Sequence, residues 1–342
     1  MHPIALRQAA LAALLVASSA TWAAAPRTFV STSGSDSNSA SNCGPTTPCR
    51  TFNVALAATN AGGEVVALNS GGYGTATITQ AVSIVIPSGI DGAISVPAAT
   101  SGITVNAPGA LVVLRGLSIT GQSVASTIGI DIVAAGRVVV QGANLIGLDS
   151  GISALSGGSL DVTASTINDC FTGIALAPAT GTLTATVQGS NISGSTGDGI
   201  DVFNNALLSV DSSVFSVNGG YGVSGSTTVL GATIGVGVWN SRFFGNVGGG
   251  VSVSDTSGAT TNSSTSGGEM KNTLVLGGGN CVNVAGVASM GLLNNTLSGC
   301  TVGVNAASGA LVSSSGDNSV GSRTKTLLGG QANVPLPLGT YY

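Results

Sequence analysis

The sequence predicts an all-β solenoid, in which short strands stack as successive coils of one rod. Composition is the first reason. The 342 residues include 53 glycines and 6% are charged, far below the roughly 25% of ordinary globular domains. The second reason is that Val, Ile, Leu and Ala occur in short alternating runs between turn-forming residues, which is typical of β-strands. Neither disorder nor a helical bundle fits this pattern.

The third reason is a repeat with a shortest spacing of 22 residues. Each repeat has a glycine or cysteine directly before an aliphatic residue, at Gly129, Gly151, Gly173, Gly199, Gly222, Gly250, Cys281 and Gly303. Six or seven residues earlier, most repeats carry another apolar residue, so each repeat holds a strand, a polar turn and a second strand. Such a unit cannot bury its apolar side alone, so its neighbours must stack. This predicts a parallel β-helix over residues 64–320, with about ten or eleven rungs rising ~4.8 Å each.

Residues 1–23 are predicted to be a signal peptide. Arg7 precedes an apolar stretch that ends near Ala20, and small residues lead to an expected cleavage site after Ala23. The apolar stretch is shorter than the roughly 20 residues that a membrane-spanning helix needs. We therefore expect an exported bacterial protein without a transmembrane segment after signal removal, located outside the cell, at its surface or in the periplasm.

The next residues are predicted to close the first end of the rod. Residues 24–50 contain a proline-bearing loop between Cys43 and Cys49, which we expect to form a disulfide in an oxidising compartment. Residues 51–63 are predicted to form one short helix with a glycine as its C-terminal stop. Residues 321–342 are expected to be a C-terminal tail or cap.

The segment around this helix resembles the opening of a known family. A short helix, a strand, the turn Gly72, Tyr73 and Gly74, and two further aliphatic strands are similar to the start of secreted right-handed parallel β-helix proteins, the pectin-lyase-like group. The string LRGLSITG at 114–121 also resembles a rung of that group. The resemblance implies a single-stranded right-handed parallel β-helix over roughly residues 27–320, capped by the short helix. Because the matching motifs are structural, they specify the fold and leave the activity open.

Charge and histidine content exclude several functions. Loss of Arg7 with the signal peptide leaves 8 basic and 13 acidic residues, a net charge of −5. We therefore expect no nucleic acid and no anionic membrane as partner. The single histidine, His2, is lost as well. The mature chain can form neither a Ser-His-Asp nor a Cys-His site, nor the usual histidine-bearing catalytic zinc site.

No residue is assigned a catalytic role. The pectin-lyase-like group includes pectate lyases and polygalacturonases, and the string GDGID at 197–201 resembles part of a polygalacturonase motif. The other strings of that motif, an Asp-Asp pair, Gly-His-Gly and Arg-Ile-Lys, do not occur in this sequence. Asp131 and Asp201 are predicted to face outward three rungs apart, about 14 Å. That separation exceeds the roughly 5 to 9.5 Å of a glycosidase pair.

Three aspartates in consecutive turns are weak candidates for a calcium site. Asp149, Asp169 and Asp198 carry the hard oxygen ligands that calcium prefers. They lie two, four and one residues before their repeat glycines, so their registers differ. Solvated turns are the simpler interpretation, and no other metal or cofactor is predicted.

The remaining cysteines are assigned structural roles. Cys170 and Cys300 each lie three residues before a repeat glycine, so both occupy the same turn position. Cys170 has no base or cationic neighbour in the sequence to activate its thiol, and it is predicted to be buried and free. Cys281 and Cys300 are 19 residues apart, three fewer than one rung, and the sequence leaves open whether they are bonded.

A polar stretch at residues 254–273 is predicted to project from the rod as a loop. Arg242, Asp255, Glu269 and Lys271 lie on or near it, where both charge signs gather. These four are the candidate binding residues. A surface loop without a ligand is the default interpretation.

Three classes of function remain. The favoured one is an exported, non-catalytic rod that serves as a surface, adhesive or carbohydrate-binding scaffold, with polysaccharide or cell-surface glycan as partner. The alternative is a polysaccharide lyase or glycoside hydrolase with an atypical site. Ice binding is suggested by TATIT at 75–79, but such threonine triplets do not recur in register.

Overall fold

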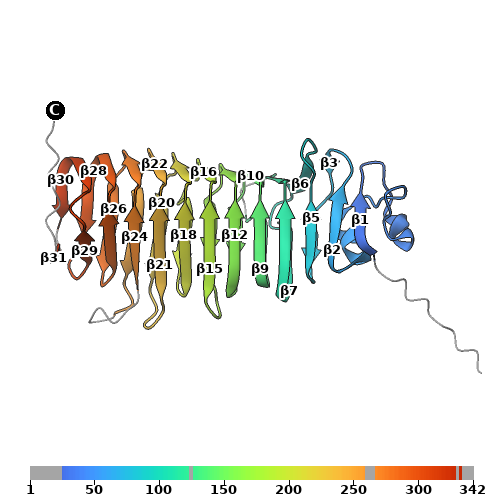
Figure 1. Cartoon of the computed structure of the whole chain (residues 1–342), viewed down its shortest axis with the longest axis horizontal. Coiled ribbons are helices and arrows are strands. Elements are labelled where there is room, and N and C mark those ends of the chain that lie inside the picture. The colour runs from blue at the N-terminus through green and yellow to red at the C-terminus, as the bar shows by residue number, and fades with distance from the viewer. Residues whose placement is uncertain (1–24, 123–125, 259–265, 329–330, 333–342) are drawn as a thin grey trace, which may run out of the picture.

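The computed structural model describes residues 25–122, 126–258, 266–328 and 331–332, which form one elongated rod (Figure 1). As the repeat predicts, the rod is an all-β parallel solenoid of about 10 turns with almost no helix. Its strands form three parallel sheets that run along the rod, here called sheets A, B and C in chain order.

Sheet A contains β1 (Ala25–Val30), β2 (Thr59–Ala67), β5 (Val82–Val85), β12 (Gly158–Thr163), β15 (Leu183–Gln188), β18 (Ala206–Asp211), β21 (Ile234–Trp239), β24 (Gly267–Lys271), β27 (Ser289–Leu293), β29 (Leu311–Ser314) and β31 (Gln331–Ala332). Sheet B contains β3 (Gly71–Gly72), β6 (Gly92–Val96), β8 (Leu117–Gly121), β10 (Asn144–Ile146), β13 (Thr166–Asn168), β16 (Asn191–Ser193), β19 (Val214–Ser216), β22 (Arg242–Phe244) and β25 (Leu274–Leu276). Sheet C contains β4 (Ala76–Ile78), β11 (Ser150–Ala154), β14 (Thr172–Leu176), β17 (Ile200–Phe203), β20 (Tyr221–Thr227), β23 (Gly249–Asp255) and β26 (Asn280–Gly286). Some long strands turn a corner and join two sheets: β7 (Ser101–Arg115) and β9 (Ile128–Gln141) pass from sheet C to sheet A, and β28 (Thr296–Ala306) and β30 (Ser319–Leu328) pass from sheet B to sheet C.

A typical coil thus has three strands, where the repeat predicts two. The two predicted strands are those of sheets B and C, on either side of the repeat glycine. Sheet A supplies the third strand, which lies between one repeat and the next. Connections of different lengths precede β15, β21 and β24, so these strands do not keep a constant distance from the glycine. The connections before β15 and β21 project from the same edge of the rod (Figure 1).

The outward positions predicted for Asp131 and Asp201 belong to one row of register partners on sheet C. It runs through Asp131, Ser153, Ala175, Asp201, Ser224, Ser252, Asn283 and Asn305. Near its end, Asn305 Nδ2 donates a hydrogen bond to Asn283 Oδ1 at 2.7 Å, and Asn283 Nδ2 donates to Ser252 Oγ at 3.0 Å. Because successive coils keep the same register, side chains at one position form a row along the rod.

Apolar side chains of successive coils stack inside the rod. In sheet B the inward residues are fully buried and register partners of one another: Leu145, Ile167, Ile192, Phe215, Phe243, Val275 and Leu297. The rings of Phe215 and Phe243 stack with their centroids 4.8 Å apart. Each coil thereby covers apolar surface of its neighbour, which stabilises the rod by roughly 25 cal/mol per Å² of surface removed from water.

The repeat glycines lie where neighbouring coils approach most closely. A Cβ atom at Gly151 would lie 2.6 Å from the carbonyl oxygen of Gly173, and one at Gly173 would lie 2.4 Å from that of Gly199. Real Cβ atoms essentially never come so close to a neighbour, and a backbone oxygen in a strand cannot swing away. The glycines of the repeat are therefore a packing requirement of the stack.

Cys281 takes the place of a repeat glycine, and it is bonded to Cys300 of the next corner with a Cα–Cα distance of 5.6 Å. This settles the pairing that the sequence leaves open. Cys170 is buried and unbonded, as predicted. Burial raises the pKa of its thiol to about 11, so the thiol stays protonated near neutral pH and is unsuited to nucleophilic catalysis.

Buried serines hold the corner between sheets A and B. The backbone N–H of one serine donates to the hydroxyl of the next coil's serine at 3.2 Å, through Ser165, Ser190, Ser213 and Ser241. At the corner between sheets B and C, both the backbone and the side-chain amide of Asn218 donate to Asn246 Oδ1. These bonds satisfy backbone groups that the tight corners would otherwise bury unpaired.

The helix α1 (Phe52–Ala58) covers the first end of the core, as the family resemblance implies. Thr51 is its N-cap, and its buried Phe52 packs on Tyr73 with ring centroids 5.0 Å apart. The helix ends at Ala58 instead of residue 63, because β2 begins at the next residue and pairs with both β1 and β5. β1 therefore extends sheet A before residue 64, and β30 and β31 extend the rod past residue 320.

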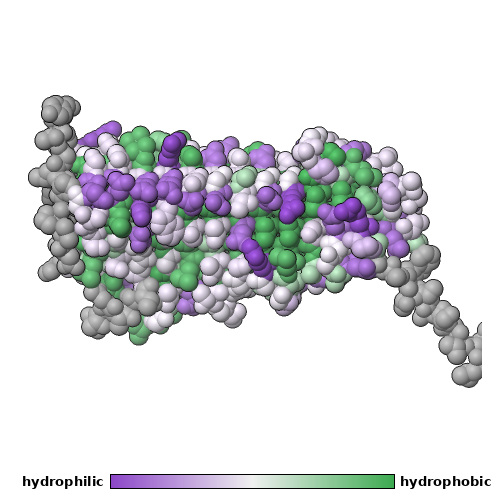
Figure 2. All heavy atoms as spheres, viewed as in Figure 1, coloured by the Kyte–Doolittle hydropathy of each residue, from purple (hydrophilic) through white to green (hydrophobic). Residues whose placement is uncertain are grey.

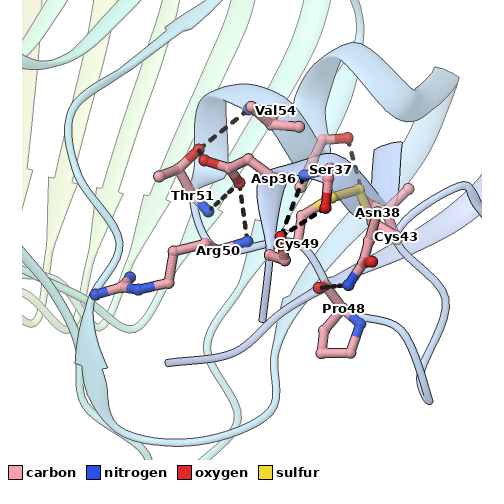
Figure 3. Close-up of a disulfide and its surroundings, with 12 residues drawn as sticks. Asp36, Ser37, Asn38, Cys43, Pro48, Cys49, Arg50, Thr51 and Val54 are labelled. Carbon is pink, nitrogen blue, oxygen red and sulfur yellow. Dashed lines mark hydrogen bonds between the residues drawn. A yellow bond between two sulfur atoms is a disulfide. The ribbon is translucent and has the colours of Figure 1, made fainter. Parts of the chain in front are cut away.

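The predicted disulfide between Cys43 and Cys49 is confirmed, with a Cα–Cα distance of 4.9 Å (Figure 3). It follows the 3-10 helix η1 (Asp36–Ser41). The Asp36 carboxylate accepts hydrogen bonds from the backbone amides of Arg50 and Thr51 at 2.9 and 3.0 Å (Figure 3). The disulfide loop is thereby fixed to the N-terminus of α1. Within the described ranges, no helix is long and apolar enough to cross a membrane.

Candidate functional site

Three neighbouring strands of sheet A carry a grid of outward residues that we call the Trp239 surface. Read across β18, β21 and β24, its rows are Leu207, Gly235 and Gly267; Ser209, Gly237 and Glu269; and Asp211, Trp239 and Lys271. The glycines leave backbone open to solvent. The result is a shallow depression of about 360 Å³.

The glycines of this surface let the Trp239 side chain lie on the sheet. A Cβ atom at Gly237 would be 2.0 Å from Cη2 of the Trp239 ring, so no other residue fits beneath the indole without moving it. On the neighbouring row, a Cβ atom at Gly235 would be 3.0 Å from Cδ2 of Leu207. Trp239 remains partly exposed. The strand therefore presents an aromatic ring beside a flat glycine shelf.

Two of the four predicted binding residues belong to the Trp239 surface. Glu269 lines the depression, and Lys271 is the register partner of Trp239. Arg242 lies past the corner on sheet B, where it lines a separate depression of about 220 Å³ with Ser212, Ser213, Val214 and Asn240. The structure thus gathers three of the four residues around one edge of the rod, with Glu269 and Arg242 in separate depressions and Lys271 in neither.

Asp255 is placed apart from the other three. It is buried at the end of β23, and its Oδ1 accepts hydrogen bonds from the backbone amide and the hydroxyl of Ser257 at 3.1 and 2.6 Å. The stretch predicted as a loop at 254–273 is shorter than expected, because β24 already begins at Gly267. Residues 259–265 of that stretch lie outside the described residues.

An exposed row of amides borders the Trp239 surface at the corner between sheets A and B. Asn240 Nδ2 donates to Asp211 Oδ1 at 2.7 Å, Asn272 Nδ2 donates to Asn240 Oδ1 at 3.2 Å, and Asn294 Nδ2 donates to Asn272 Oδ1 at 2.8 Å. The viewed side of the rod carries a band of hydrophilic residues parallel to its axis over the C-terminal half (Figure 2). Stacked coils therefore produce polar rows that lie along the rod.

A second cluster of polar side chains lies on sheet C. Asp201 lies in the outward row, and its carboxyl group hydrogen bonds to that of Asp198 in the preceding turn. Asp198 Oδ1 also accepts a hydrogen bond from the backbone amide of Tyr221. The Tyr221 hydroxyl in turn accepts a hydrogen bond from Asn280 Nδ2 at 3.1 Å. Burial raises the pKa of Asp201 to about 8, and the hydrogen bond and negative charge of Asp198 act in the same direction.

The chemistry of this carboxyl pair is limited by its geometry. Two carboxyl groups in direct hydrogen bond are closer than the roughly 5 to 9.5 Å that a glycosidase pair needs to place a sugar or water between them. Asp131, the other aspartate of the outward row on sheet C, is three strands away from Asp201, as predicted. The raised pKa of Asp201 favours the protonated form of its carboxyl group.

The three aspartates considered for calcium do not form one site. Asp149 and Asp169 line a cavity of about 130 Å³ together with Cys170, Phe171 and Thr196. Asp198 instead contacts Tyr221 on the next coil. In the part of the chain that the structure describes, no group of three or more His, Cys, Asp or Glu side chains could hold a metal ion.

Neither the role of Trp239 nor the contact between Asp198 and Asp201 is indicated by the sequence pattern. The sequence signal for Trp239 is weak. Gly237 beneath it lies on the same strand, but Gly267 and Glu269 lie on β24, after a connection of variable length. The contact between Asp198 and Asp201 depends on the turn conformation before β17, which spacing alone does not specify.

The sequence of residues 101–266 matches the family model of the right-handed β-helix region. No curated protein shows significant sequence similarity to the chain. Among solved structures, the pectate lyase Pel9A is 15% identical with a TM-score of 0.59, over 90% of this chain and 78% of that one. An alginate lyase from Paenibacillus sp. strain FPU-7 is 16% identical with a TM-score of 0.60, over 91% of this chain and 100% of that one.

Identities this low show the fold alone. The fold they indicate is the parallel β-helix described above. The family-model match also gives the hand of the coil. The chain is a right-handed parallel β-helix protein with the pectin-lyase-like fold.

Proposed function

We propose that this protein is an exported, non-catalytic β-helix that binds polysaccharide on its Trp239 surface. One observation carries the proposal: a partly exposed tryptophan lies flat against a glycine shelf, with the Glu269 carboxylate in the same depression. The C–H face of a sugar ring is apolar and its edge carries hydroxyl groups. An aromatic ring beside a few polar groups suits such a ligand.

The rod shape supports binding of a long chain. Equivalent positions on neighbouring strands recur about every 4.8 Å along the axis, so a polymer lying along the rod meets similar groups repeatedly. Export is supported by the predicted signal peptide at residues 1–23 and by two disulfides, which are typical of oxidising compartments. Outside the cell, at its surface or in the periplasm, polysaccharide and cell-surface glycans are available ligands.

The proposal predicts that Trp239→Ala reduces polysaccharide binding by at least about tenfold, since the main stacking surface of the ligand is removed. A glycan array probed with the secreted protein identifies the ligand, and titration of the variants measures the loss. The matched control is Phe171→Ala, which removes another exposed aromatic ring, 57% exposed, elsewhere on the rod. Equal binding by wild type and Trp239→Ala, or equal losses in both variants, would contradict the proposal.

The alternative function is cleavage of a polysaccharide by a lyase or hydrolase site. It is favoured by the Asp198 and Asp201 carboxyl groups beside Tyr221, on a fold shared with two lyases. Our proposal predicts no measurable cleavage of pectin, polygalacturonate or alginate. Such cleavage needs a base and a neutralising cation converging on one sugar, and Arg242 and Lys271 lie on the other side of a corner from sheet C.

Cleavage is tested by the absorbance of unsaturated products and by release of reducing sugar, each with and without calcium. Turnover that disappears in Asp201→Asn would establish the alternative and place the site on sheet C. Turnover lost instead in Arg242→Ala or Lys271→Ala would place a catalytic site at the edge of the Trp239 surface.

A further inference from the structure

We propose that the polysaccharide bound by the Trp239 surface is uncharged. This inference rests on the proposed function and specifies the chemical class of the ligand. Pectate and alginate, which give the two structural neighbours their names, are chains of negatively charged uronates, so the inference does not follow from the fold.

The charged groups that line the depression carry the argument. Its lining consists of glycines, Leu207, Leu208, Val236, Trp239 and Glu269. Glu269 is the one charged residue among them, and it is exposed. In the part of the chain that the structure describes, Glu269 takes part in no ion pair. Its carboxylate can accept hydrogen bonds from sugar hydroxyl groups, whereas a uronate in the same depression would face a like charge.

The nearby cations do not line this depression. Lys271 does not line it, although it is the register partner of Trp239. In the row of Trp239, Lys271 contributes one positive charge. Asp211, the other neighbour of Trp239 in that row, adds a second carboxylate.

Arg242 does not line the Trp239 depression either. It lines the separate depression past the corner, with Asn240 and Ser212. The long-range field has the same sign as the local one, because the whole chain carries a net charge of −4. At low ionic strength, where the screening length rises to about 30 Å at 0.01 M, a polyanion is repelled before it reaches the surface.

The test compares binding of the mature protein to soluble uncharged polysaccharides, namely a β-glucan, a xylan and a mannan, with binding to polygalacturonate and alginate. Each is measured in wild type and Trp239→Ala at low and at physiological salt. We expect Trp239-dependent binding to at least one uncharged chain with little dependence on salt. We expect weaker binding of both uronates, weakest at low salt.

A variant that reverses the charge of Glu269 tests the role of this residue by itself. Glu269→Lys is expected to raise affinity for polygalacturonate by about tenfold, from the loss of one repulsion and the gain of one attraction near the ligand. Asp91→Lys changes the net charge equally at an exposed turn far from β21 along the rod, and is expected to give a smaller gain. Equal gains in both variants would overturn the argument from Glu269.

The outcomes distinguish failure of this inference from failure of the proposed function. If a polyuronate binds more tightly than every uncharged chain, and Trp239→Ala abolishes that binding, the inference is wrong and the proposed function stands. If Trp239→Ala reduces binding of none of the five polysaccharides, both the inference and the proposed function fail.

Discussion

Gly173→Ala is expected to destabilise the rod by about 3 kcal/mol or more, in the upper range for overpacked cores. The new Cβ would lie 2.4 Å from the carbonyl oxygen of Gly199 and 2.7 Å from Cγ2 of Ile192. Neither atom can yield freely, because one belongs to the hydrogen-bonded backbone of the next coil and the other to the packed core. Urea or thermal unfolding followed by circular dichroism measures the loss.

The matched control is Gly189→Asn in the next corner. Gly189 has a φ of +57° and open space where a Cβ would be. Asparagine tolerates this left-handed conformation better than most residues, so the expected change is below about 1 kcal/mol. A Gly173→Ala variant as stable as this control would show that the glycines of the repeat are not required by close packing of the coils.

Asp201 is expected to make the protein less stable as pH rises. Its pKa moves from an ordinary value of 3.8 to about 8 in the folded chain. Between these values the folded state holds a proton that the unfolded state has lost, so the stabilisation is complete below about pH 4 and is lost as pH rises through 8. A pKa difference of one corresponds to about 1.4 kcal/mol. After allowance for solvent screening of a partly exposed group, the free energy of unfolding is expected to fall by about 2 to 4 kcal/mol.

The Asp201→Asn variant tests this directly. Its amide can donate to Asp198 at every pH, so its free energy of unfolding is expected to change much less between pH 5 and pH 9 than that of wild type. Asp91→Asn removes an exposed turn carboxylate and serves as the control for the general effect of charge. If wild type and Asp201→Asn show parallel pH dependence, the carboxyl pair does not hold its proton in the folded state.

The regular part of the fold could be predicted from the sequence because the same physical demand recurs in every coil. Close approach requires glycine before the sheet C strand, and the core requires an aliphatic residue after it, as at Gly151 and Ile152. This fixes the register, including the outward position of Asp201. Sheet A was not predicted because connections of different lengths precede its strands, and its outward residues are as varied as Thr184, Leu207 and Gly235.

The irregular contacts could be predicted only in part. The spacing of 19 between Cys281 and Cys300 left their bond open, and the structure brings them together because one occupies a repeat-glycine position and the other an inward corner position. Glu269 and Lys271 were found by their charge. The role of Trp239 depends on Gly237 beneath it and on Glu269 of the next strand, a relation that appears only once the register is known.

The fluorescence of Trp239 tests the central claim most directly. The chain has two tryptophans, Trp22 and Trp239, so a mature chain that begins at residue 24 reports on Trp239 alone. A sugar ring stacked on the indole excludes water from it. Titration with a polysaccharide that binds should therefore shift the emission to shorter wavelength and saturate with the same dissociation constant as an independent binding assay. Saturable binding that leaves the emission unchanged would contradict the claim that polysaccharide binds on the Trp239 surface.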